Sequence, residues 1–163
     1  MNNLKQIGLA LHMYAQDFDE SFPVGSIAVG TTGCVESCYE CLLKTDFVKG
    51  KKLFVCPSDY SNVSIQPDAD NNLGTGGDYV SYAYCTGLSE MTSTDSAIAC
   101  DRIGTKASAI ATTPELNADG PHKAVGINVL YIDGHVKWVA ERDLSDVANL
   151  GYAAFYNPGE ATP

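Results

Sequence analysis

The first eighteen residues constrain the fold most, because their apolar side chains follow the period of an α-helix. Apolar residues stand at alternating steps of three and four: Leu4, Ile7, Leu11, Tyr14 and Phe18. This spacing places them on one face of a helix over Asn2 to Phe18. Pro23 predicts an end nearby, since the residue before a proline disfavours helical geometry. A helix with one apolar face must bury it against another element.

The best partner for this helix is a hairpin from Ile127 to Val139, INVLYIDGHVKWV. Asp133-Gly134 between its two apolar runs suits the positive φ angles of a type I′ turn. A two-residue loop fixes the register. The face that we expect to be buried then consists of Ile127, Val129, Tyr131, Val136 and Trp138. On this prediction Trp138 packs beside Leu11 or Tyr14 of the helix.

The remaining segments predict a small α+β domain rich in loops. Alternating aromatic and apolar residues favour strands at Tyr79–Cys85 and Ser96–Asp101. A second short helix is expected over Glu36–Phe47 and a short extended run over Leu53–Cys56. Between them and the first strand lies a long polar loop, Ser58–Asp78, of a length that is usually functional or mobile. The expected architecture is a long N-terminal helix packed on a small antiparallel β-sheet.

Length and charge narrow the class of protein. The 163 residues suit a single domain over 1–163 that can bury a core. Twenty acidic and ten basic residues give a net charge of −10, with no basic patch for nucleic acid or an anionic membrane surface. No apolar run approaches the ~18 residues of a membrane span.

Six cysteines predict disulfides: Cys34, Cys38, Cys41, Cys56, Cys85 and Cys100. Their even number suggests an oxidising compartment. We expect at least two bridges, one of them involving the Cys34–Cys41 group, although the sequence does not choose the pairing. A four-thiolate zinc site of the first four cysteines is the alternative. Disulfides are favoured because only Cys38 and Cys41 have the spacing of a zinc knuckle.

A weaker metal candidate lies in the polar loop. Asp68, Asp70 and Asn72 offer oxygen ligands at alternate positions, as calcium loops do. A complete EF-hand loop also needs Gly and Glu at its sixth and twelfth positions, where this chain has Leu73 and Tyr79. A solvated acidic loop is therefore the favoured interpretation, with calcium binding as the alternative.

The three histidines, His12, His122 and His135, are candidates for catalysis, with Asp101 and Asp133 as possible partners. No nucleophile motif accompanies them. We therefore interpret them as residues that fix loops by hydrogen bonds. The sequence predicts neither an enzyme nor a cofactor.

Three segments together resemble a family of type IV pilin-like and type II secretion pseudopilin-like proteins with a prepilin-type N-terminus. They are NNLKQIGLALHMYAQDFDESFP, then LFVCPSD followed by YVSYAY, and finally HKAVGINVLYIDGHVKWV. The last resembles the family's His…Asp-Gly motif, here His122, Asp133 and Gly134, as structural residues. Ten residues separate His122 from Asp133, one more than in the family pattern, and a bulge near Ala124–Gly126 would absorb the extra residue.

The resemblance implies a pilin-like fold and a structural subunit of a type II secretion pseudopilus or type IV pilus-like assembly. It implies a leader and a membrane helix preceding Asn2 in the native gene, so that the inner membrane anchors the protein. The domain would then lie on the periplasmic or extracellular side of the bacterial cell envelope, and other pilin-like subunits would contact the N-terminal helix. A secreted or surface-anchored ligand-binding module, using Ser58–Asp78, is the alternative, and a thiol or zinc enzyme is a third hypothesis.

Overall fold

The computed structural model describes residues 1–24, 35–59, 71–74, 79–102, 120–140, 143 and 155–156. Its helices are α1 (Asn2–Asp17) and α2 (Val35–Lys44), with 3₁₀ turns η1 (Lys51–Phe54) and η2 (Lys123–Val125). Its strands are β1 (Tyr82–Cys85), β2 (Ala97–Asp101), β3 (Gly126–Tyr131), β4 (Val136–Ala140) and β5 (Phe155–Tyr156). Within these ranges, every helix is too short or too polar to cross a bilayer.

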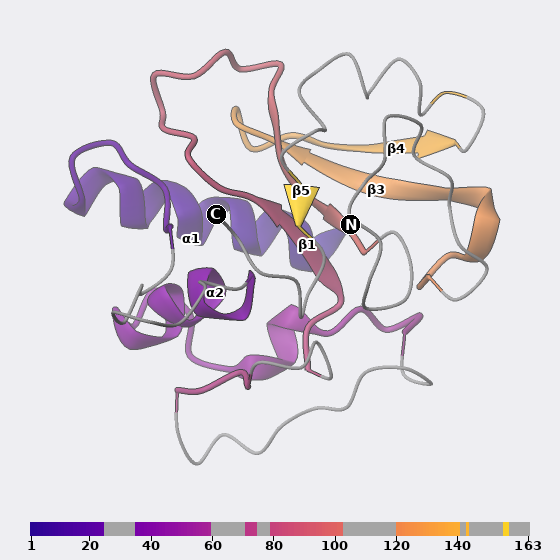
Figure 1. The fold of residues 1–163 in the computed structure, drawn as a ribbon, viewed down its shortest axis with the longest axis horizontal. Coiled ribbons are helices and arrows are strands. Elements are labelled where there is room, and N and C mark those ends of the chain that lie inside the picture. Colours follow the sequence, from indigo (N-terminus) through magenta and orange to yellow (C-terminus); the bar gives the residue numbers. More distant parts are fainter. Residues whose placement is uncertain are drawn as a thin grey trace.

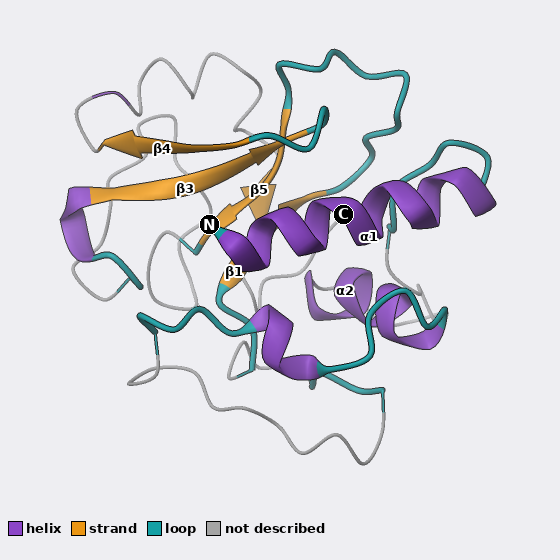
Figure 2. Cartoon of the chain, turned by 180° about the vertical axis from the view of Figure 1, so that it is seen from behind, coloured by secondary structure: helices purple, strands orange, loops and turns teal. Residues whose placement is uncertain are grey.

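The strands form one antiparallel sheet in the order β4-β3-β2-β1-β5 (Figure 1). Helix α1 packs against one face of this sheet, where it contacts β3. In Figure 2 the helix lies between the β3–β4 hairpin and α2. The predicted α+β architecture, an N-terminal helix on a small antiparallel sheet, is therefore confirmed.

The apolar face of α1 is buried over most of its length, as its period predicts. Leu4, Ile7 and Leu11 are almost fully enclosed. Gly8 lets the helix approach the sheet closely, since a Cβ there would lie 2.9 Å from Cδ1 of the buried Leu130. Phe18 is exposed, because it stands one residue after the helix ends.

The β3–β4 hairpin exists, but its predicted register is wrong by one residue. Tyr131 N–H donates to His135 O at 3.0 Å, and Gly134 N–H donates to Tyr131 O at 2.9 Å. With Gly134 at φ +83°, this is a three-residue loop ending in a left-handed glycine, not a two-residue type I′ turn. Trp138 consequently lies opposite Asn128.

The faces of β3 are also the reverse of the prediction. Leu130 and Ile132 join the cluster beneath the helix. Ile127, Val129 and Tyr131 are buried as predicted, but in a second cluster on the opposite face. The predicted burial of Trp138 beside Leu11 or Tyr14 is wrong: the indole lies near Gly126 and the His122 ring and is 39% exposed.

Other local predictions differ from the structure at chain reversals. The second helix ends at Lys44, and Asp46 turns the chain with φ +65°. The expected extended run at Leu53–Cys56 is instead the 3₁₀ turn η1, followed by an extended Val55. In place of a bulge, η2 accommodates the extra residue before β3, with Lys123 at φ +56°.

The structure shows no disulfide among the five cysteines that it describes, Cys38, Cys41, Cys56, Cys85 and Cys100, so the predicted bridges are not found there. Cys100 lies opposite Ala83 on β1, so Cys85 is only its diagonal neighbour. Diagonal residues are ~7–8 Å apart, too far for a bridge. Cys41 donates its S–H within α2, to Ser37 O at 3.3 Å. Cys34 lies outside the described residues.

Candidate metal centre

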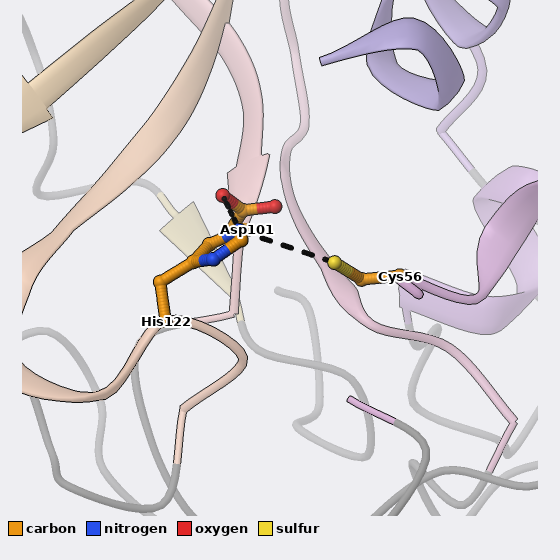
Figure 3. A group of neighbouring side chains, drawn as sticks. All are labelled: Cys56, Asp101 and His122. Carbon is orange, nitrogen blue, oxygen red and sulfur yellow. Dashed lines mark hydrogen bonds and ion pairs between the residues drawn. The ribbon is translucent and has the colours of Figure 1, made fainter. Parts of the chain in front are cut away.

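Three side chains with metal-binding atoms, Cys56, Asp101 and His122, point toward one another at the end of β2 (Figure 3). Their donor atoms all lie within 4.8 Å of one another. His122 Nε2 is 3.2 Å from Asp101 Oδ2 and 3.9 Å from Cys56 Sγ. Cys56 and Asp101 are buried, whereas His122 is partly exposed. The site thus combines a sulfur, an oxygen and a nitrogen donor at the edge of the core.

The segment that carries Cys56 is held by hydrogen bonds that two other parts of the chain donate to its backbone carbonyls. Phe54 O, at the end of η1, accepts a hydrogen bond from Ser81 N–H at 2.8 Å. Val55 O accepts one from the Asn3 amide at 3.0 Å. Cys56 is therefore held between the first turn of α1 and the chain that leads into β1.

Asp101 and His122 are brought together by the pairing of β2 with β3. Asp101 ends β2, and its Oδ2 accepts hydrogen bonds from Asn128 N–H at 2.6 Å and from the Asn128 amide at 2.8 Å. His122 immediately precedes η2, and its ring meets the Trp138 ring edge-on at 5.3 Å. One asparagine of β3 thus orients the carboxylate toward the imidazole.

The electrostatics and the geometry both argue against a cysteine nucleophile. The hydrogen bond to Asp101 raises the pKa of His122, against the opposing effect of burial. Burial raises the pKa of the Cys56 thiol, whereas a nucleophilic cysteine needs a lowered pKa. The same ring atom, Nε2, faces both Cys56 and Asp101, whereas a catalytic triad uses the two ring nitrogens separately. Convergence of three donors is instead typical of ligands around a cation.

A buried ion pair lies next to these ligand residues. Arg102 follows Asp101, and its guanidinium donates to Asp59 Oδ2 at 2.9 Å and Oδ1 at 2.8 Å. Asp59 N–H in turn donates to Cys56 O at 2.9 Å. The pair therefore connects the Cys56 segment to the end of β2.

The other predicted histidines lie in a different place. His12 Nδ1 is 2.7 Å from Glu90 Oε1. His135 N–H donates to Asp133 Oδ1 at 2.9 Å, and its ring also bonds that oxygen. Both ion pairs are partly exposed. Gly134, which stands between Asp133 and His135, has the positive φ that this turn requires. This agrees with the interpretation of Asp133, Gly134 and His135 as turn residues.

Two predicted metal groups are only partly visible. Asp68, Asp70 and Cys34 lie outside the described residues, while Asn72 Oδ1 accepts a hydrogen bond from Gly74 N–H at 2.6 Å. Calcium binding remains a prediction. Within the described ranges, the structure does not group Cys56 with Cys38 and Cys41, because Cys56 faces Asp101 and His122. No spacing pattern in the sequence indicates this group, since Cys56 and His122 are 66 positions apart.

The chain is thus an α+β domain in which a helix packs on an antiparallel sheet, with a Cys–Asp–His group at the end of β2. A family model described as "Protein of unknown function (DUF1559)" matches residues 1–38, which hold α1 and the start of α2. The N-terminal part of the chain is thus similar to this family, and it includes the segment that resembles pilin-like proteins. Neither a curated protein nor a solved structure matches the chain.

Proposed function

We propose that the chain is a structural subunit of a pilin-like assembly, of the type II secretion pseudopilus or type IV pilus kind. The proposal includes anchoring in the inner membrane of the bacterial cell envelope, with the described domain on the far side. It is supported by the helix-on-sheet architecture and by the family match over α1. The order of the three resembling segments also supports it.

The observation that carries the proposal is an apolar flank of α1 that its own core leaves exposed. Leu9 and Met13 are 64% and 42% exposed, one turn apart on the same helix. They border a groove of about 310 Å³, whose opposite wall includes Phe47 and Leu53. An exposed apolar surface bordered by polar residues is typical of a protein contact site. In this proposal, the flank packs against the equivalent helix of a neighbouring subunit.

We expect this role to be structural rather than enzymatic. The buried thiol of Cys56 lacks the lowered pKa that a nucleophile needs. The His122 nitrogen that faces this thiol, Nε2, also contacts the Asp101 carboxylate, so it is not arranged as a general base for Cys56. A scaffold subunit requires neither an activated residue nor a cofactor.

Photo-crosslinking in the producing cells tests the contact. A photo-reactive phenylalanine analogue replaces Leu9 in the native full-length gene, and the products are identified by mass spectrometry. The matched control carries the analogue in place of Met91, an exposed apolar residue on the loop between β1 and β2.

The expected products from the Leu9 site are crosslinks to this protein or to other pilin-like subunits, in the membrane or sheared-surface fraction. The Met91 site should give few. Equal crosslinking from both sites, or products that contain only soluble proteins, would contradict the proposal.

A further inference from the structure

The Cys56, Asp101 and His122 side chains have the donor types and spacing of a zinc site. Zinc takes thiolate sulfur at ~2.3 Å and imidazole nitrogen or carboxylate oxygen at ~2.0 Å, in tetrahedral geometry. From these lengths, neighbouring nitrogen and oxygen ligands lie about 3.3 Å apart, and nitrogen and sulfur ligands about 3.5 Å. The structure has 3.2 Å between His122 Nε2 and Asp101 Oδ2, and 3.9 Å between Nε2 and Cys56 Sγ. These two distances between donor atoms thus differ by only a few tenths of an ångström from those between ligands of a bound zinc ion.

The choice of cation follows from the donor set. A thiolate favours zinc over magnesium or calcium, which prefer oxygen ligands, and the imidazole suits zinc equally well. One thiolate and one carboxylate also balance the two positive charges of the ion. This balance matters because Cys56 and Asp101 are buried, where an uncompensated charge is strongly disfavoured.

The residues around the ligands hold them in place, as metal sites require. Carboxylate ligands are usually held by further hydrogen bonds. Asp101 Oδ2 accepts two such bonds from Asn128, one from its backbone N–H and one from its amide. The Asp59–Arg102 pair fixes the segments that carry Cys56 and Asp101.

We propose that Cys56, Asp101 and His122 bind one zinc ion, with a water molecule completing the tetrahedron. On binding, the Cys56 thiol releases its proton to solvent and becomes a thiolate ligand. His122 binds through Nε2 as a neutral imidazole, with its proton on Nδ1, and Asp101 binds as the carboxylate. The ion then joins three segments that are remote in sequence: the segment after η1, the end of β2 and the entrance to β3. This proposal stands independently of the pilin-like role.

Metal titration of the reduced protein tests the site. The protein is stripped with a chelator and titrated with Co²⁺, which replaces zinc and gives a near-ultraviolet charge-transfer band only when bound to thiolate. Zinc content after dialysis is then measured by elemental mass spectrometry. We expect one equivalent of either metal and an intense cobalt band.

Matched variants assign the metal to its ligands. Cys56→Ser should abolish the cobalt band and weaken binding at least tenfold, and His122→Gln should weaken it by a similar factor. Asn128→Ala should weaken binding about 10–100-fold, because it removes the amide that donates to the Asp101 carboxylate. The two controls are Cys85→Ser, a buried thiol in the second apolar cluster, and the double variant Cys38→Ser/Cys41→Ser, and both should keep the band.

A measurement on the wild-type chain keeps the proposal testable if a variant fails to fold. Zinc should protect Cys56 from alkylation and leave Cys41 equally reactive with and without metal, as mapped by peptide mass spectrometry. Failure to bind one equivalent, a band that survives Cys56→Ser, or a band lost in the Cys38/Cys41 double variant would overturn the proposal. In the last case the metal would belong to the cysteines of α2.

Discussion

Replacing Arg102 by methionine removes one partner of an ion pair that is closed off from water. The Arg102 and Asp59 side chains are only 6% and 0% exposed. Two hydrogen bonds join them, at 2.9 and 2.8 Å. Hydrogen bonds to charged groups each contribute about 1.5–3 kcal/mol, and the substitution removes both. It also leaves the Asp59 carboxylate buried without this cation, and breaking such a pair typically lowers stability by about 3–5 kcal/mol.

We therefore expect Arg102→Met to lower the free energy of unfolding by about 3–5 kcal/mol. Urea unfolding followed by circular dichroism measures the change. The matched control is Lys49→Met, which removes the cation of the Asp46–Lys49 pair. That pair is 3.5 Å long with both side chains largely exposed, so its loss should cost less than about 1 kcal/mol.

A second substitution separates the two causes of this loss. Adding Asp59→Leu to Arg102→Met removes the buried carboxylate as well, and it should recover part of the lost stability. If Arg102→Met costs no more than Lys49→Met, the pair is not the buried contact that the structure describes. If the double variant is less stable than Arg102→Met alone, desolvation of the carboxylate is not what destabilises the single variant.

Three further predictions concern the sheet and its turn. Gly126→Ala should lower stability by ~1–3 kcal/mol in urea unfolding, because its Cβ would lie 2.5 Å from a backbone oxygen of β4; an unchanged midpoint would contradict this. Leu130→Ala should cost about 2–5 kcal/mol and the exposed Leu9→Ala less than about 0.5 kcal/mol, so equal losses would place Leu130 outside the core. The hydrogen bond from His135 N–H lowers the pKa of Asp133, so its stabilisation is present above the ordinary value of 3.8 and is lost as pH falls through the lowered pKa. Asp133→Asn should therefore reduce the acid sensitivity of the unfolding midpoint, and an unchanged pH profile would refute it.

Periodicity was enough to predict α1, because one strong apolar face over four turns has few alternative structures. It was not enough to predict the hairpin register. Asp133-Gly134 is compatible with a two-residue turn and also with a three-residue loop ending in Gly134, since both place a glycine at positive φ. Both faces of β3 are buried, so apolar residues at Val129 and Leu130 favour neither register over the other.

The number of cysteines was a poor guide to disulfides for a different reason. An even number of cysteines carries no information on distance, whereas a disulfide requires Cα atoms within about 7 Å. In this fold, β1 and β2 place Cys85 and Cys100 as diagonal neighbours, and both thiols fill the second apolar cluster. They behave there as small hydrophobic side chains.

The Cys–Asp–His group depends on contacts that no local pattern contains. Cys56 lies in one segment that resembles the pilin-like family and His122 begins another, yet the fold places their side-chain atoms 3.9 Å apart. They meet at Asp101, which belongs to neither segment and is oriented by Asn128. If His122 served only to fix the hairpin, it would need no partner in the segment after η1. The contact instead couples the two segments, so a substitution at Cys56 should also change the environment of His122 at the entrance to β3.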